Sequence, residues 1–342
     1  MTELNTGFIA PLLDWYRRVM RPLPWREDRE PYHVWVSEIM LQQTRIEAVM
    51  RYYARFMEAL PDVRALSEVD GDVLLKLWEG LGYYSRARHL KRAAQTIMDD
   101  FGGRFPDHYE AIRTLPGVGD YTAGAIASIC FDEKVPAVDG NVLRVVARLT
   151  GDRRNILLPQ TKKAVADTLK EIMPDDAGAF NEALMELGEV VCLPNGAPLC
   201  DRCPLLGLCT AHRENLTAEL PVRVKEIRRS SARKSVFIIR CGERIAVEKR
   251  PDTGLLSGMY QLPNTEGFHP EEELRDVLRS WGLNPREITF LKDAKHVFTH
   301  VDWYMKGYAV TVDKACDRFL WATEEELKTA CPLPTAFKKL LK

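Results

Sequence analysis

The feature that most constrains the fold is a change of residue periodicity near position 235. From about residue 8 to 190, apolar residues recur every three or four positions, as on one face of a helix, and Pro- and Gly-containing breakers separate these stretches. Beyond the change, short β-rich runs alternate with turn residues around one amphipathic helix at 271–281. The pattern predicts a multidomain chain, with an all-α domain over residues 1–215 and an α+β domain over residues 236–342.

Residues 216–235 join the two predicted domains and carry six basic residues against two acidic ones. This segment can be a solvated linker, or it can lie along a phosphate backbone, and the residues leave both readings open. The net charge of the 342 residues is only -1, which excludes a chain coated in positive charge but not a local basic surface. We find neither a run of about 20 apolar residues nor a secretory signal, so we expect no membrane association.

Four of the eight cysteines gather between residues 192 and 209. Structural disulfides are rare in cytosolic proteins, so such a cluster indicates a metal site. Zinc sites with four thiolates usually come as two C-x2-C pairs, and only one such pair occurs here. The unequal spacing therefore favours a [4Fe–4S] cluster over zinc. The predicted ligands are Cys192, Cys200, Cys203 and Cys209.

A Leu-Pro-Gly-Val-Gly string at residues 115–119 stands between two predicted helices. Glycines leave backbone N–H groups accessible, and the N-terminus of the following helix attracts an anion. Contacts of this kind hold a protein on the DNA backbone without reading its sequence. We therefore predict that Gly117, Val118 and Gly119 bind a DNA phosphate.

Two carboxylates stand in apolar surroundings, Glu38 in a helical stretch and Asp139 just before an apolar helix. Burial raises the pKa of a carboxyl group and lets it hold a proton, whereas a helix N-terminus favours the ionised form. Two carboxyl groups with divergent pKa values are the usual equipment for breaking a glycosidic bond. A single Glu or Asp is otherwise more often a helix cap or a solvated residue, and the sequence does not show that these two meet.

Four motifs occur in the order found in the helix-hairpin-helix DNA glycosylases, whose iron–sulfur branch contains endonuclease III and the MutY adenine glycosylases. They are Ser-Glu-Ile-Met-Leu-Gln-Gln-Thr (37–44), Leu-Pro-Gly-Val-Gly (115–119), Val-Asp-Gly-Asn-Val (138–142) and the cysteine loop (192–209). The chain resembles the MutY family over nearly its full length. Tyr121 stands where endonuclease III has a lysine nucleophile, and a phenol cannot form a Schiff base.

The resemblance implies a DNA repair enzyme that flips an adenine out of double-stranded DNA, where it is mispaired with 8-oxoguanine or guanine, and hydrolyses its N-glycosidic bond. It implies that Glu38 protonates the adenine and that Asp139 stabilises the cationic sugar. Tyr121 would hold the sugar and the transition state, and Asn141 would orient water or Asp139.

Further residues match family positions that contact the base or the duplex. Arg26 and Glu182 correspond to the adenine pocket, although either can be an ordinary ion-pair residue. Leu41, Gln43 and Tyr83 correspond to residues that enter the duplex near the 8-oxoguanine. The commoner fate of a residue such as Leu41 or Tyr83 is a helix core.

The C-terminal part resembles the Nudix-like (MutT-like) domain of the MutY family, on residues 254–263 and 296–300. Its helix lacks the arginine–glutamate core of a Nudix box, which predicts a module for 8-oxoguanine recognition rather than a Mg²⁺ enzyme. Phe298, Thr299 and His300 align with a loop that commonly reads Phe-Ser-His. Thr299 keeps the hydroxyl and adds a methyl group, and the first cysteine spacing is seven residues where many members have six.

Three alternatives stay open: an endonuclease III-like glycosylase with lyase activity, a non-catalytic lesion sensor with a redox cluster, and a nucleotide pyrophosphohydrolase. Tyr121 argues against the first, the pair of Glu38 and Asp139 against the second, and the degenerate box against the third. We expect a monomer that acts in the bacterial cytoplasm, associated with the nucleoid.

Overall fold

The computed structural model describes residues 4–224 and 229–341. The chain divides into two compact units, residues 1–68 with 89–225 and residues 69–88 with 226–342, and each is described by itself. The first unit is helical and the second combines helices with a mixed sheet, which confirms the predicted fold classes. Lys225, Glu226 and Arg228 of the predicted basic linker lie outside the described residues.

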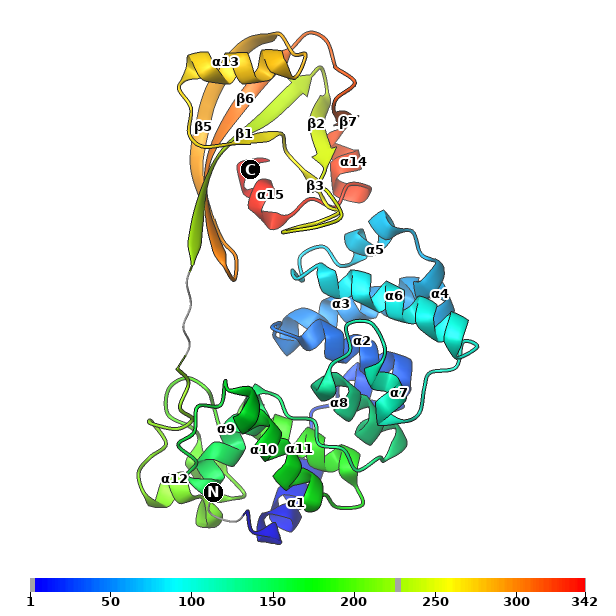
Figure 1. Ribbon diagram of the computed structural model, residues 1–342, viewed down its shortest axis with the longest axis vertical. Coiled ribbons are helices and arrows are strands. Elements are labelled where there is room, and N and C mark those ends of the chain that lie inside the picture. The colour runs from blue at the N-terminus through cyan, green and yellow to red at the C-terminus, as the bar shows by residue number, and fades with distance from the viewer. Residues whose placement is uncertain (1–3, 225–228, 342) are drawn as a thin grey trace. The chain divides into compact units, whose positions relative to one another are not determined.

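The first unit consists of α-helices joined by short loops and 3-10 turns (Figure 1). Its elements are η1 (Thr6–Phe8), α1 (Ile9–Val19), η2 (Pro24–Arg26), α2 (Pro31–Leu41), α3 (Ile46–Ala59), α4 (Val63–Glu68), α6 (Ser85–Asp100, which begins in the second unit), α7 (Tyr109–Arg113), α8 (Asp120–Phe131), α9 (Gly140–Thr150), α10 (Pro159–Glu171), α11 (Ala177–Val190), η3 (Cys200–Arg202), η4 (Leu206–Leu208) and α12 (Thr210–Arg213). In the part of the chain that is described, no helix has the length and apolarity needed to cross a membrane.

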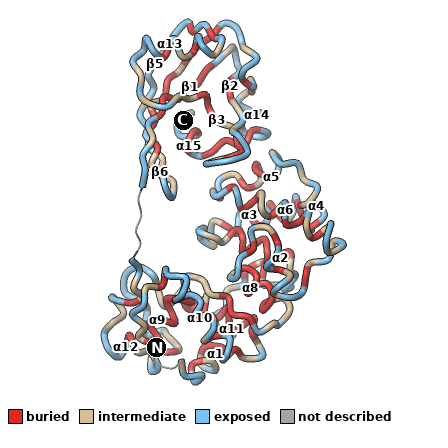
Figure 2. Tube along the Cα trace, viewed as in Figure 1, coloured by how far each residue is buried: buried red, intermediate tan, exposed pale blue. Residues whose placement is uncertain are grey.

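The core of the first unit is built around α11, which packs against α1, α8 and α9. Residues 177–184 of α11 are all buried, as are residues 122–129 of α8 (Figure 2). Polar side chains within these buried stretches, such as Asn181 and Glu182, are therefore held inside the protein.

Apolar residues at three- and four-residue spacing lie along one face of α3. Val49, Tyr53 and Phe56 are buried, whereas Met50 is 38% exposed. Met50 directly follows Val49 and therefore points about 100° away from it around the helix, at the edge of the buried stripe.

The second unit contains a seven-stranded sheet whose main path is β3-β2-β1-β6-β5, with β4 on β1 and β7 on β2. β1 and β6 are parallel, and the other pairs are antiparallel. The strands are β1 (Ser230–Cys241), β2 (Arg244–Lys249), β3 (Tyr260–Gln261), β4 (Asn264–Glu266), β5 (Pro285–Val297), β6 (Val301–Val312) and β7 (Leu320–Ala322). The long strand β5 carries charged residues along most of its length and was not indicated by the sequence pattern.

Helices cover both faces of this sheet (Figure 1). Phe237 and Ile239 of β1 face α13 (Glu271–Ser280), whereas Val236 and Ile238 face α14 (Glu324–Thr329) and α15 (Thr335–Leu341). This alternation is the period of two that a strand buried on both faces requires.

A helical segment from the N-terminal half, residues 69–88, belongs to the second unit and includes α5 (Gly71–Leu77). Asp72 accepts an ion-paired hydrogen bond from Lys249 at 2.6 Å, and Glu79 pairs with Lys338 at 2.9 Å. The periodicity of the sequence gives no sign of this grouping, because the paired residues are far apart along the chain.

Candidate active site

Glu38 is a buried carboxyl group near the C-terminal end of α2. This helix starts at Pro31, and its residues from Val34 to Met40 are all buried. The helix therefore carries the Glu38 carboxyl group into the interior of the unit, away from bulk water.

Tyr121 lies in the first turn of α8 and reaches Glu38 directly. Its hydroxyl donates a hydrogen bond to Oε2 of Glu38 at 2.7 Å and also lies 3.2 Å from Sδ of Met185 in α11. Burial raises the pKa of the Tyr121 phenol well above its ordinary value, and the nearby Glu38 and Asp139 add to this rise. The phenol therefore keeps its proton at neutral pH and serves as a hydrogen-bond donor.

Asp139 is the N-cap of α9, and three N–H donors hold its carboxyl group. Oδ1 accepts from the backbone N–H groups of Asn141 and Val142 at 2.8 Å each, and Oδ2 accepts from Nδ2 of Asn141 at 2.8 Å. Burial raises the pKa of Asp139, while these donors and the more distant Arg144 lower it. The donors stabilise the carboxylate and fix its orientation.

The pKa of Glu38 is raised to about 7, chiefly by burial. The negative charges of Asp139 and Glu182 also raise it, whereas the hydrogen bond from Tyr121 and the charge of Arg26 lower it. In the part of the chain that the structure describes, no backbone N–H group donates to the Glu38 carboxyl group as two do to that of Asp139, so the two carboxyl groups occupy different environments. Such a difference is what a pair of one acid and one carboxylate needs near neutral pH.

A third carboxyl group, Glu182 of α11, is held by Arg26 of η2. Nε of Arg26 lies 3.0 Å from Oε1 of Glu182, and the Tyr16 hydroxyl hydrogen-bonds the same carboxylate. Arg26 and Glu182 thus form an ion pair, which is the alternative role expected for both residues from the sequence. Both also line the cavity that contains Glu38. Burial raises the pKa of Glu182, and the charge of Arg26 opposes that rise.

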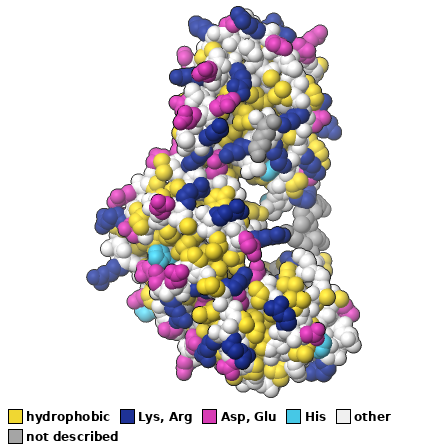
Figure 3. Space-filling view, turned by 180° about the vertical axis from the view of Figure 1, so that it is seen from behind, with side chains coloured by type: hydrophobic (Ala, Val, Ile, Leu, Met, Phe, Trp, Pro, Cys, Tyr) yellow, Lys and Arg dark blue, Asp and Glu magenta, His cyan; other side chains and the backbone are white. Residues whose placement is uncertain are grey.

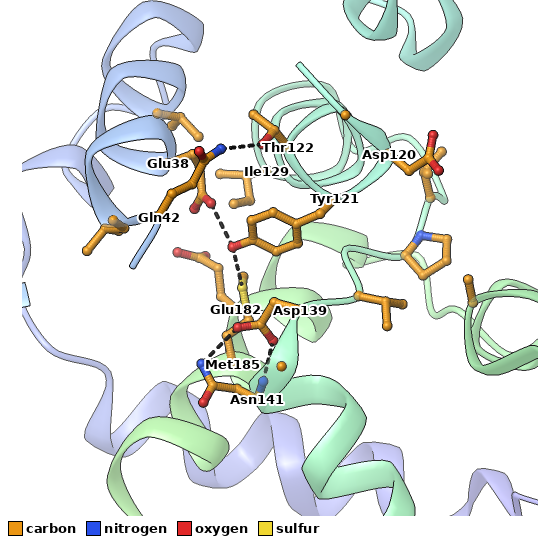
Figure 4. A pocket seen from close by; sticks show the side chains of 18 of the residues that line it. Glu38, Gln42, Asp120, Tyr121, Thr122, Ile129, Asp139, Asn141, Glu182 and Met185 are labelled. Carbon is orange, nitrogen blue, oxygen red and sulfur yellow. Dashed lines mark hydrogen bonds between the residues drawn. The ribbon is translucent and has the colours of Figure 1, made fainter. Parts of the chain in front are cut away.

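These groups line one cavity of about 1290 Å³. Figure 4 shows the Glu38, Asp139 and Glu182 carboxyl groups gathered around the Tyr121 hydroxyl, with Met185 behind it. The sequence-predicted residues on the cavity wall are Arg26, Glu38, Leu41, Gln43, Gly119, Tyr121, Asp139, Asn141 and Glu182. A space bounded by three carboxyl groups and a phenol can bind a flat polar base and deliver a proton to it.

Met185 and Glu186 are among the cavity residues that the sequence reasoning missed. Both stand on α11 within four positions of Glu182, so helical spacing from Glu182 is the signal that could have found them. Glu186 is buried and accepts hydrogen bonds from both Arg21 and Arg26.

The predicted phosphate-binding string lies between α7 and α8, and its last residue, Gly119, lines the cavity of the first unit. Gly117 has a φ of +80°, and a Cβ there would come within 2.5 Å of the His89 side chain, so only glycine fits. Gly119 is the N-cap of α8, and a Cβ there would meet no atom within 4 Å. Val118 is buried, so its contribution to an anion site comes from its backbone.

The four clustered cysteines are free thiols that lie around the loop between α11 and α12. Burial raises the pKa of the Cys203 thiol to about 11, and the charges of Cys192, Cys209 and Cys200 add to the rise. Nη1 of Arg148 lies 3.3 Å from Sγ of Cys192. Within residues 4–224 and 229–341, no group of three or more His, Cys, Asp or Glu side chains is arranged to hold a metal ion. The donor set itself, four partly buried cysteines on one loop, is of the chemical type that binds an iron–sulfur cluster.

The remaining predicted residues lie in the second unit. Phe298, Thr299 and His300 form the turn between β5 and β6, and the Thr299 hydroxyl lies 3.1 Å from the hydroxyl of Tyr83. The Phe298 ring packs between His296 and Trp303, with centroid distances of 4.6 and 4.8 Å.

Hydrogen bonds to two backbone carbonyl groups also hold this turn. Arg229 donates to the carbonyl of Phe298 at 3.0 Å, and the Ser230 N–H donates to the carbonyl of His300 at 3.1 Å. Tyr83 is 44% exposed, so it is not the helix-core residue of the alternative reading.

Comparisons with known proteins agree with both halves of this description. A model of the HhH-GPD superfamily of base excision DNA repair proteins matches residues 36–175, and a model of the NUDIX domain matches residues 235–342. Adenine DNA glycosylases of Rattus norvegicus and Homo sapiens are each 33% identical to the chain over 98% of its length, covering 78% and 74% of those proteins. That of Buchnera aphidicola subsp. Baizongia pistaciae is 32% identical over 90% of the chain and 87% of its own length.

Among solved structures, a thermostable thymine-DNA glycosylase superposes with a TM-score of 0.55 at 28% identity, over 61% of this chain and 96% of that one. A trapped endonuclease III–DNA covalent intermediate superposes with a TM-score of 0.52 at 24% identity, over 62% of this chain and 99% of that one. At that identity the second similarity establishes the helical fold alone.

Proposed function

The chain belongs to the adenine DNA glycosylase family, and from this membership we propose that it removes adenine opposite 8-oxoguanine or guanine in double-stranded DNA. As a member of this family it is an N-glycosylase of base excision repair with helix-hairpin-helix and NUDIX domains. The observation that carries the proposal is the pairing of Glu38 and Asp139 across one buried cavity beside Tyr121.

Glu38 acts as the general acid. Its pKa of about 7, raised chiefly by burial, leaves a proton on the carboxyl group at neutral pH. Transfer of this proton to a ring nitrogen of the flipped adenine, most favourably N7, lets the base leave as a neutral molecule. The electrons of the C1′–N9 bond go to the base, and positive charge develops on the sugar.

Asp139 stabilises the sugar cation. Its carboxylate is fixed by three N–H donors and cannot rotate freely, so its charge is in place before the bond breaks. Water then adds at C1′ and leaves an abasic site. Asn141 donates to Asp139 through both its backbone and its side chain, which supports a role in orienting that carboxylate.

Arg26 and Glu182 form the wall that contacts the adenine, with the Glu182 carboxylate as an acceptor for its amino group. Gly117, Val118 and Gly119 offer backbone N–H groups to a phosphate, while Leu41 and Gln43 meet the duplex from the cavity wall. Lys and Arg side chains are interspersed with Asp and Glu over the face seen in Figure 3, which supports local rather than general attraction to DNA.

The cysteine loop holds a [4Fe–4S] cluster through Cys192, Cys200, Cys203 and Cys209. Members of this family typically carry such a cluster, and the four cysteines of this chain stand within 18 residues on one loop, which supports this assignment. When bound, the cluster cross-links the loop between α11 and α12. Arg148 donates a hydrogen bond from Nη1 to the Cys192 sulfur at 3.3 Å and holds that side chain in place.

The second unit recognises the 8-oxoguanine through the turn of Phe298, Thr299 and His300. The hydroxyl of Thr299 forms a hydrogen bond with that of Tyr83, and the ring of Phe298 packs between two aromatic neighbours. These contacts support a turn whose conformation is fixed before DNA binds. On α13, Arg279 pairs with Asp276 at 3.3 Å, which supports recognition rather than Mg²⁺ chemistry at this helix.

One assay tests the function. A duplex with an end-labelled strand containing adenine opposite 8-oxoguanine is incubated with the protein, and half of each sample is heated in alkali. We expect strand breaks only after alkali, because hydrolysis leaves an intact abasic strand. Breaks without alkali would show an additional lyase step, and the absence of breaks in both halves would refute the proposal.

A further inference from the structure

Glu186 is a charged side chain in the interior of the first unit that the mechanism above does not use. Its side chain is 1% exposed, and it lies one helical turn beyond Glu182 on α11. Arg21 contacts it with two nitrogens, at 2.5 and 3.1 Å, and Arg26 contacts it with a third at 3.0 Å. A buried carboxylate with this many charged donors holds those donors in place.

The guanidinium group of Arg26 therefore makes polar contacts with three different groups. Its Nε faces Glu182 at 3.0 Å, its Nη2 faces Glu186 at 3.0 Å, and its Nη1 faces the carbonyl of Arg21 at 3.3 Å. The two arginines and two glutamates form a quartet with no net charge. Both carboxylates are required for that balance, and the charge of Glu182 raises the pKa of Glu38.

We propose that Glu186, ion-paired to Arg21, is a positioning residue that fixes Arg26 and, through Arg26, the Glu182 carboxylate in the wall of the adenine pocket. This inference rests on the proposed function, because it concerns the same pocket. Glu186 acts through Arg26 and does not contact the base.

The proposal has an electrostatic consequence at Glu38. The charged and titratable groups that face Glu38 are Tyr121 from α8, Asp139 before α9, Glu182 from α11 and Arg26 from η2. Loss of the Glu186 charge leaves the positive charge of Arg26 poorly balanced, which favours the ionised form of Glu38. Loss of the Arg21 charge leaves the quartet negative, which favours the protonated form.

The two substitutions Glu186→Gln and Arg21→Gln should therefore shift the pKa of Glu38 in opposite directions. A role limited to packing would not produce opposite shifts. The matched control is Arg17→Gln, because Arg17 also pairs with a carboxylate at the start of α11, Asp176 at 3.1 Å, but on the surface, with its side chain 58% exposed. Glu186→Asp keeps the charge and serves as the rescue variant.

The experiment measures single-turnover adenine release from a duplex with adenine opposite 8-oxoguanine, across pH, for the full-length protein and these variants. We expect Glu186→Gln to slow release by roughly 10²-fold, through misplacement of Arg26, and to lower the pH at which the rate falls on the alkaline side. Arg21→Gln should raise that pH, Glu186→Asp should recover part of the rate, and Arg17→Gln should match the wild type.

Unchanged profiles for Glu186→Gln and Arg21→Gln, or shifts in the same direction, would overturn the proposal. If Glu186→Gln fails to give a cooperative thermal unfolding transition, the variant Arg21→Gln decides the question, because the Arg21 side chain is partly exposed. A pH profile of Arg21→Gln that shifts to higher pH supports the proposal, and an unshifted profile overturns it. A wild-type protein that releases no adenine would instead overturn the proposed function, so the two failures are distinguishable.

Discussion

Removal of the Tyr121 hydroxyl tests whether Glu38 is the acid. In the variant Tyr121→Phe the ring stays in place, but the hydrogen bond of 2.7 Å to Oε2 of Glu38 is lost. This bond lowers the pKa of Glu38 against the effect of burial, which raises that pKa to about 7. Without the donor, the ionised form of Glu38 becomes less favourable, and its pKa must rise.

The size of the shift follows from the bond. A hydrogen bond to a charged group is worth about 1.5–3 kcal/mol, and 1.36 kcal/mol corresponds to one pKa unit. Water in the cavity replaces part of the lost bond, so we expect a shift of about one unit. An acid must be protonated to act, so the wild-type rate should be full below the pKa of Glu38 and fall as pH rises through about 7. In Tyr121→Phe the fall should begin about one pH unit higher.

Single-turnover rates of adenine release between pH 5.5 and 9 measure this midpoint. Tyr32→Phe is the matched control, because it removes a buried tyrosine hydroxyl that donates to the Leu60 carbonyl at 2.7 Å, away from the cavity. Its midpoint should equal that of the wild type. A Tyr121→Phe midpoint that stays in place or moves to lower pH would show that Glu38 does not set the profile.

Three further predictions concern the acid, the lesion turn and the cysteine loop. Glu38→Gln should slow adenine release by about 10²–10⁴-fold. Because the pKa of Glu38 is raised in the folded protein, the stability it contributes is present below its ordinary value of 4.5 and lost as pH rises through about 7. Urea unfolding should therefore show that the free energy of unfolding of Glu38→Gln, relative to that of the wild type, increases by about 3 kcal/mol between pH 4 and pH 8.5. An equal difference at both pH values would contradict a raised pKa of the buried carboxyl group. Thr299→Val and Tyr83→Phe each remove one hydroxyl of the 3.1 Å contact between these residues. Their effects on the preference for 8-oxoguanine over guanine should therefore be strongly non-additive. Additive effects would show that the two residues act independently. Cys203→Ser should lower the iron bound per chain and the temperature of unfolding, whereas Cys316→Ser, outside the loop, should change neither; equal iron contents would refute the assigned ligands.

Local chemistry made part of the site readable from the residues alone. An Asp followed by Gly-Asn-Val before an apolar helix is an N-cap signal, and Asp139 caps α9 with its side chain. The spacing of the cysteines, the Gly117 turn and the switch from helical to strand periodicity are equally local, because each depends on neighbours a few positions away. For these features the sequence determined both the element and the chemistry it offers.

The tertiary structure decided which of these groups meet and in what state of charge. Tyr121 reaches Glu38 across 83 positions of sequence, and the pKa of Glu38 depends on burial by helices from the whole unit. Likewise, Glu186 gains its role from Arg21 and Arg26, more than 150 positions away, and residues 69–88 join the second unit through pairs such as Asp72 with Lys249. Burial and long-range pairing arise only when the chain is packed, so the distances and states of charge in the site come from the tertiary structure.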